Sequence, residues 1–151
     1  MEMHTAMQFS MGQTLIDIEK FFDHVPLRAV VETAYKVDYP LVELALGLQM
    51  HQAPRRISTG EAMSERLWPR RSLIAGCGQS VEFSRLVLWD ILEYAHAQYR
   101  PQELGTWVDD IIHQEAGREV QVAEQLIQVT RGLVGKLTAR GFKVSPKSVV
   151  L

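Results

Sequence analysis

Three aspartates lie among apolar residues in this 151-residue sequence. Asp17 is the single charge in the run from Thr14 to Ile18, and Asp109 and Asp110 interrupt the apolar run from Trp107 to Ile112. An ionised carboxylate in such surroundings is costly unless a partner offsets its charge. Carboxylate oxygens favour Mg²⁺ or Mn²⁺ over zinc. Two such ions can activate a 3′-hydroxyl and stabilise a leaving pyrophosphate, which is one chemistry that the three acids could serve.

Each acid also has an ordinary structural explanation. Acidic pairs are common in solvated hairpin turns, and Asp17 could simply end a strand. A calcium-binding EF-hand is excluded, because the stretch from Asp17 to Arg28 has no glycine at its middle position and no closing Glu. The single Cys77 has no partner for an internal disulfide and no Cys/His cluster of zinc spacing beside it. We expect Cys77 to be a packed residue and His113 to be a surface histidine.

The acids require strands and turns that bring them together. A short β-branched run predicts a strand from Thr14 to Ile18, and the run from Trp107 to Ile112 predicts a hairpin with the acids at or beside its turn. A second hairpin is predicted around Thr59-Gly60, with strands at 56–58 and 63–67. Two further strands are expected at 142–144 and 149–151.

Apolar residues at helical spacing predict four helices. Asp38 is expected to cap the second, whose buried face would carry Leu41, Leu44, Ala45 and Leu48, and Ser80 to cap the third. The predicted helices span 26–36, 38–51, 80–99 and 122 to just before 141. The order β-α-α-β-β-α-β-β-α-β predicts an α+β fold in which helices cover one face of an antiparallel sheet.

The composition fits one soluble domain spanning residues 1–151, with 46% hydrophobic and 23% charged residues. The lone cysteine favours a reducing, intracellular compartment, and neither a signal peptide nor a membrane span is expected. The net charge of -2 gives no basic surplus for gripping a nucleic-acid backbone.

Four blocks in the sequence follow one another in a recognisable order. The first runs from Asp17 to Asp23 and on through Val25-Pro26-Leu27. The second is the Gly-rich loop from Arg71 to Ser80. The third is Val108-Asp109-Asp110, preceded by Trp107, and the fourth runs from Gly141 to Lys147. Together they resemble the palm of reverse transcriptases, which are RNA-directed DNA polymerases, most nearly those of group II introns and of retrotransposons without long terminal repeats.

The resemblance implies a role for four residues of the reaction centre. Asp17, Asp109 and Asp110 would be the catalytic carboxylates that bind two Mg²⁺ or Mn²⁺ ions. Lys147 would protonate the pyrophosphate leaving group, although an exposed turn lysine is the simpler alternative. The expected partners are an RNA or DNA template with its primer and deoxynucleoside triphosphates.

The resemblance also implies three substrate contacts. Phe22 would act as a steric gate against a ribose 2′-hydroxyl, or would alternatively be a core residue. Ala75 and Gly76 would lie under the templating pair and the incoming nucleotide. Most of the fingers and all of the thumb that accompany such a palm are expected to be missing. A non-catalytic nucleic-acid-binding or interaction module derived from such a palm is therefore the alternative function.

Overall fold

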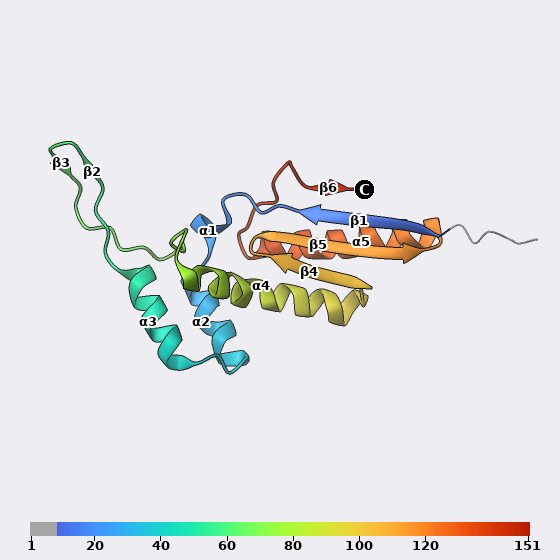
Figure 1. Ribbon diagram of the computed structural model, residues 1–151, viewed down its shortest axis with the longest axis horizontal. Helices are drawn as coiled ribbons and strands as arrows, with labels where there is room; N and C mark the ends of the chain where they lie inside the picture. The colour runs from blue at the N-terminus through green and yellow to red at the C-terminus, as the bar shows by residue number, and fades with distance from the viewer. Residues whose placement is uncertain (1–8) are drawn as a thin grey trace, which may run out of the picture. The chain divides into compact units, whose positions relative to one another are not determined.

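The computed structural model describes residues 9–151, which form two compact units (Figure 1). The sheet unit comprises the described residues up to Glu19 together with Ile91–Leu151, and the helical unit comprises Lys20–Asp90. The elements in chain order are β1 (Ser10–Ile16), α1 (Phe21–His24), α2 (Leu27–Lys36), α3 (Leu41–Gln52), β2 (Ser58–Thr59), β3 (Ala62–Met63), α4 (Gly78–Tyr99), β4 (Glu103–Trp107), β5 (Asp110–Gly117), α5 (Glu119–Ala139) and β6 (Val149–Val150). Helix α4 contributes residues to both units.

The sheet unit is built on a four-stranded antiparallel sheet in the order β4-β5-β1-β6. Within this unit the last part of α4 follows β1, the β4–β5 hairpin comes next, and α5 connects the hairpin to β6. The result is a β-α-β-β-α-β order in which the strands of two β-α-β units are interleaved in one sheet, a split βαβ arrangement. The predicted α+β class with an antiparallel sheet is confirmed.

Helix α5 covers one face of this sheet (Figure 1). Alternate residues of β1 are buried, and the Thr14 hydroxyl shares a hydrogen bond of 3.1 Å with that of Thr130 on α5. Gly12 lets the strand approach the helix closely, because a Cβ at this position would lie 2.4 Å from Leu126. The helix contributes its residues at helical spacing, all five of them as predicted: Val122, Leu126, Val129, Leu133 and Leu137.

The last turns of α4 pack against α5 through polar and aromatic contacts. The Gln125 side-chain amide donates to the Tyr99 carbonyl at 2.6 Å, and the Lys136 ammonium lies 4.0 Å from the centre of the Tyr94 ring. Gly132 leaves room for the Tyr99 ring, which would clash with any Cβ there. These contacts hold the last turns of α4 against α5.

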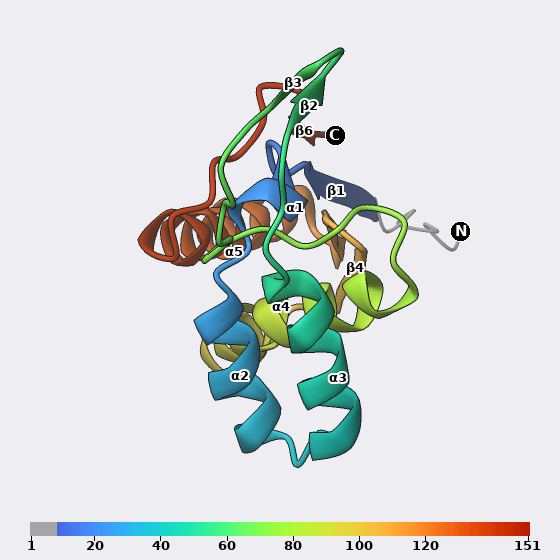
Figure 2. The same cartoon turned by 90° about the vertical axis from the view of Figure 1, so that its left-hand side faces the viewer.

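The helical unit packs short helices around the first half of α4. Helices α2 and α3 form an antiparallel pair, and the β2–β3 hairpin extends away from them (Figure 2). Phe83 is fully buried and contacts the rings of Tyr39 and His51. The remaining buried apolar residues of this unit are Phe21, Val25, Leu27, Ala29, Val30, Ala34, Leu44, Leu73, Leu86, Val87 and Leu88.

Both predicted helix caps are wrong. Asp38 has a φ of 52°, in the left-handed region, whereas an N-cap residue needs an extended backbone, and α3 begins after Pro40 instead. Ser80 lies inside α4, which begins at Gly78, and its hydroxyl donates to the Ile74 carbonyl at 2.6 Å.

Several predicted boundaries and one helix face also differ from the structure. The first strand spans Ser10–Ile16, so Asp17 lies just beyond its end. The strands of the second hairpin are only two residues each, and of 142–144 only Val144 makes a bridge, to Ile18. The buried face of α3 consists of Leu44, Gly47 and His51, and Leu41 and Ala45 are exposed.

Candidate functional site

Strand pairing brings Asp17 opposite Asp110. The last ladder pair between β1 and β5 is Ile16 with Ile111, and the two acids occupy the next position on each strand. Side chains alternate between the two faces along a strand, and the buried Ile16 and Ile111 face α5. Both carboxylates therefore point to the opposite face of the sheet, away from α5. Trp107 pairs with Asp110 from the other side and is 76% exposed. A row of Trp107, Asp110 and Asp17 therefore lies at one end of the sheet.

The Asp110 carboxyl is affected by the charges of the other two acids. The pKa of the Asp110 carboxyl is raised from its ordinary value, first by partial burial and then by the negative charges of Asp109 and Asp17. Asp110 as a residue is exposed, so solvent screens much of this repulsion. No Lys, Arg or His among residues 9–151 forms an ion pair with any of the three acids.

The segment that carries Lys147 is attached to the backbone of Asp17. Ser145 donates its N–H to the Asp17 carbonyl at 2.8 Å, and the Asp17 N–H donates to the Ser148 hydroxyl at 3.1 Å. Two residues further on, the Glu19 N–H donates to the Lys143 carbonyl at 2.8 Å. The first and fourth sequence blocks are therefore neighbours, and Lys147 lies exposed in a turn between Ser145 and Ser148.

The turn that carries the acidic pair has an unusual backbone. Trp107 and Asp110 are paired, so Val108 and Asp109 form a two-residue connection, as predicted for acids at or beside the turn. Val108 has a φ of 60°. Glycine is the usual residue at such a position, and a β-branched residue there is strained by about 1–3 kcal/mol. Strain of this kind occurs preferentially at functional sites.

The predicted substrate contacts lie in the helical unit. Leu73 donates its N–H to the Phe22 carbonyl at 2.7 Å, so the first and second sequence blocks are adjacent. The Phe22 ring is half-buried and meets Phe21 edge to face at 5.8 Å. Ala75 and Gly76 form an exposed turn in which Gly76 has a φ of 83°. The sugar-gate and nucleotide roles of these residues stay predictions.

The three carboxylates are the type of ligand that a hard divalent cation needs, but their side chains do not form a preformed binding site. Carboxylates are the ligands that Mg²⁺ and Mn²⁺ prefer, and these three form no ion pair among residues 9–151. In the positions that the described side chains take, no group of three or more His, Cys, Asp or Glu residues is close enough to hold a metal ion. Ion binding would therefore require the three side chains to move closer together.

Two buried histidines were not anticipated from the sequence. His113, predicted to be a surface residue, is fully buried, and its Nε2 lies 2.9 Å from Glu115 Oε1. Strand alternation with the apolar Ile111 would have indicated this position, because both point to the helix-covered face. His51 is also fully buried, and its Nδ1 accepts the Ile74 N–H at 3.0 Å.

No helix of residues 9–151 is long and apolar enough to cross a membrane. Comparison with known proteins adds no relative: no family model matches the chain, and no curated protein matches it significantly.

Proposed function

We propose that this chain is the palm of a metal-dependent nucleotidyltransferase of the reverse-transcriptase type, which extends a primer on an RNA template. The observation that carries the proposal is the row formed by Asp17 and Asp110, with Asp109 beside it in a strained turn. These acids come from the ends of two strands that are more than ninety residues apart in sequence, and they meet on a face that α5 leaves open.

The roles of the chain's own residues follow from this arrangement. Asp17, Asp109 and Asp110 would hold divalent ions, which when bound would promote ionisation of a 3′-hydroxyl and stabilise the leaving pyrophosphate. Lys147, attached through Ser145 to the Asp17 backbone, would be the proton donor to the leaving pyrophosphate. Trp107 offers an exposed indole beside Asp110 on which a nucleotide base can stack.

Ion binding is the first test of the proposal. Asp110 is destabilised by its neighbours' charges, so Mn²⁺ or Mg²⁺ should raise the melting temperature and alter the emission of Trp107 in a protein whose Trp68 and Trp89 are replaced by Phe. Asp110→Asn should raise the stability of the ion-free protein by about 0.2–1 kcal/mol and should remove most of the response to the ion.

Glu124→Gln is the matched control, because it removes an exposed carboxylate of α5 remote from the row. It should leave the ion response unchanged. An Asp110→Asn protein that responds to Mn²⁺ as the wild type does would contradict the assignment of the acids.

The non-catalytic alternative is favoured by one observation, the lack of a preformed cluster of three metal-binding side chains in residues 9–151. Primer extension on an RNA template with Mg²⁺ and then Mn²⁺, by the chain fused to the fingers and thumb of a related enzyme, separates the two functions. Extension that is lost in Asp109→Asn supports the polymerase. Template binding without any extension supports the binding module and overturns the catalytic proposal.

A further inference from the structure

A second group of functional side chains, mostly arginines, lies in the helical unit on residues 55–71. We call this segment the arginine arm. The arm includes the β2–β3 hairpin and extends from the end of α3 to the loop before α4 (Figure 1). Its charged residues are five arginines and two glutamates, namely Arg55, Arg56, Arg66, Arg70, Arg71, Glu61 and Glu65. The arm is therefore strongly basic within a chain whose net charge is -2.

Backbone pairing brings arginines from both sides of the hairpin together. Arg55 and Leu67 exchange two hydrogen bonds, of 2.9 and 2.8 Å. Arg56 and Arg66 are the sequence neighbours of this pair, so three arginines lie on the two segments at the base of the hairpin. At the other end of the arm, the bridge between Arg71 and Pro26 fixes the segment against the start of α2.

Most of this positive charge is not neutralised. The side chains of Arg66, Arg70 and Arg71 form no hydrogen bond or ion pair with described residues. Other exposed arginines of the helical unit are paired: Arg28 with Glu32 and Arg85 with Glu82, each at 2.7 Å. Unpaired guanidinium groups gathered on one arm form an electrostatic site for phosphate groups.

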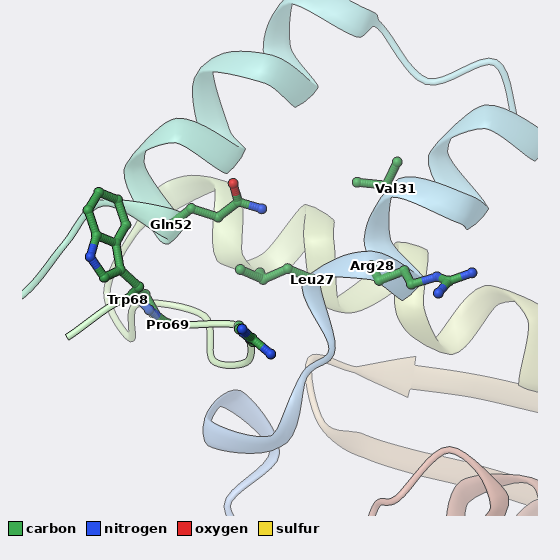
Figure 3. Close-up of a pocket in the computed structure, with 7 residues that line it drawn as sticks. Leu27, Arg28, Val31, Gln52, Trp68 and Pro69 are labelled. Carbon is green, nitrogen blue, oxygen red and sulfur yellow. The ribbon is translucent and has the colours of Figure 1, made fainter.

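A pocket of about 390 Å³ lies where the arm meets α2 and α3. Its lining combines apolar, amide and guanidinium groups: Leu27, Arg28, Val31, Gln52, Trp68, Pro69 and Arg70. Trp68 and the Gln52 amide stand on one side, Val31 and Arg28 on the other, and Leu27 lies between them (Figure 3). A flat ring can enter beside the indole while a phosphate approaches the unpaired Arg70.

The Trp68 indole is exposed to solvent, so it contributes little hydrophobic stabilisation to the folded chain. Trp68 is 68% exposed, and Ile57 and Met63 on the hairpin are exposed as well. Large apolar side chains interleaved with arginines offer stacking surfaces between phosphate contacts, which is how proteins bind unpaired strands. A duplex presents no free base face to such an indole.

We propose that the arginine arm and its pocket bind a single-stranded nucleic acid, with one base stacked on Trp68 and flanking phosphates on Arg70 and the arginines of the hairpin. The site lies on residues distinct from the acidic row and does not depend on catalysis by Asp17, Asp109 and Asp110. RNA and DNA strands share the base and phosphate chemistry that the site recognises.

The test is binding of fluorescein-labelled twelve-nucleotide RNA and DNA, measured by anisotropy at low salt with the full chain. Trp68→Ala should weaken binding by between about 5-fold and about 150-fold, the range of one base stacked on an aromatic ring. Arg70→Gln should weaken binding at low salt and lower the slope of log affinity against log salt by about 0.7.

The controls distinguish binding at this specific site from general attraction between the arginines and any polyanion. Arg85→Gln removes a paired arginine outside the arm and should leave affinity and slope unchanged, and Trp68→Phe should retain most of the stacking. Asp109→Asn should not weaken strand binding, so that loss of catalysis and loss of strand binding are distinguishable. Circular dichroism identifies any variant that fails to fold, and if Trp68→Ala fails to fold, the change in salt slope of Arg70→Gln decides the test.

Three results would overturn the proposal. They are the absence of binding by the wild type at low salt, tighter binding of a duplex of the same sequence, and competition by polyglutamate as effective as that by the oligonucleotide. A preference between RNA and DNA in the wild type, abolished in Trp68→Ala, would identify which strand the pocket selects.

Discussion

Val108, next to Asp109, has a strained backbone conformation. Its φ of 60° is disfavoured by its branched Cβ, and glycine adopts the same backbone without that penalty. We expect Val108→Gly to stabilise the folded chain by about 1 kcal/mol, after the greater backbone entropy of glycine in the unfolded chain offsets part of the relieved strain. Urea unfolding measures the change.

Val120→Gly is the comparison for this prediction. Val120 is exposed in the first turn of α5, so the same substitution there loses helix propensity and should destabilise by about 0.3–0.5 kcal/mol. Equal losses in the two variants would show that the Val108 backbone is not strained. A stabilised Val108→Gly protein with weaker ion binding would connect the strain to the positioning of Asp109.

At the level of single residues, the sequence identified the acids but not all of their surroundings. An isolated charge in an apolar run marks Asp17 and the Asp109-Asp110 pair, since desolvation makes such residues exceptional. The role of Ser145 and Ser148 in holding the Asp17 backbone could not be predicted, because these contacts link positions about 130 residues apart. The burial of His113 depends on which face of β5 the helix covers.

Gly12 determines how closely β1 can approach α5. A Cβ at this position would lie 2.4 Å from Leu126 and 3.0 Å from Val122, so Gly12→Val should destabilise by about 1–3 kcal/mol through overpacking. Gly105→Val in β4 is the matched control, because nothing lies within 4 Å of its added Cβ and valine favours strands. Denaturant midpoints of the two variants that shift equally would contradict this account.

His51 links the end of α3 to the loop before α4 and makes this connection sensitive to pH. Its Nδ1 accepts the Ile74 N–H, and its pKa is lowered from 6.5, first by burial and then by the charge of Arg55. Protonation of Nδ1 breaks this hydrogen bond. Because the folded-state pKa lies below that of the unfolded chain, the contribution of His51 to stability is complete above about pH 6.5 and is lost as the pH falls below it.

His51→Gln tests this assignment by thermal unfolding between pH 5 and pH 8. The wild type should lose stability as the pH falls below about 6.5, and the difference between wild type and variant should shrink over the same range. At pH 8 the variant should be less stable by about 1 kcal/mol or more, the value of one buried hydrogen bond. A difference that does not change with pH would exclude His51 as the titrating group.

Element prediction succeeded where one face of an element is buried and failed where burial does not select a face. The five buried positions of α5 follow a single helical stripe and were predicted without error. Helix α3 has apolar residues all round, so its spacing could not show that Leu44, Gly47 and His51 face inward. The β2–β3 hairpin is exposed on both faces, and its sequence therefore lacks the alternation that locates strand ends.

The charge of the whole molecule sets how the arginine arm meets a polyanion. With a net charge of -2, long-range attraction to a nucleic acid is weak, and association depends on the local field of the arm. Glu93→Gln combined with Glu124→Gln removes two exposed carboxylates of α4 and α5 and brings the formal net charge to zero. At about 20 mM salt this double variant should bind a single-stranded oligonucleotide faster by a factor of a few, with little change in the dissociation rate.

At about 0.5 M salt the Debye length falls to roughly 4 Å and the two proteins should associate at the same rate. Stopped-flow fluorescence at the two salt concentrations measures both rates. A gain that persists at high salt would show that the two glutamates act locally rather than through the overall charge of the chain.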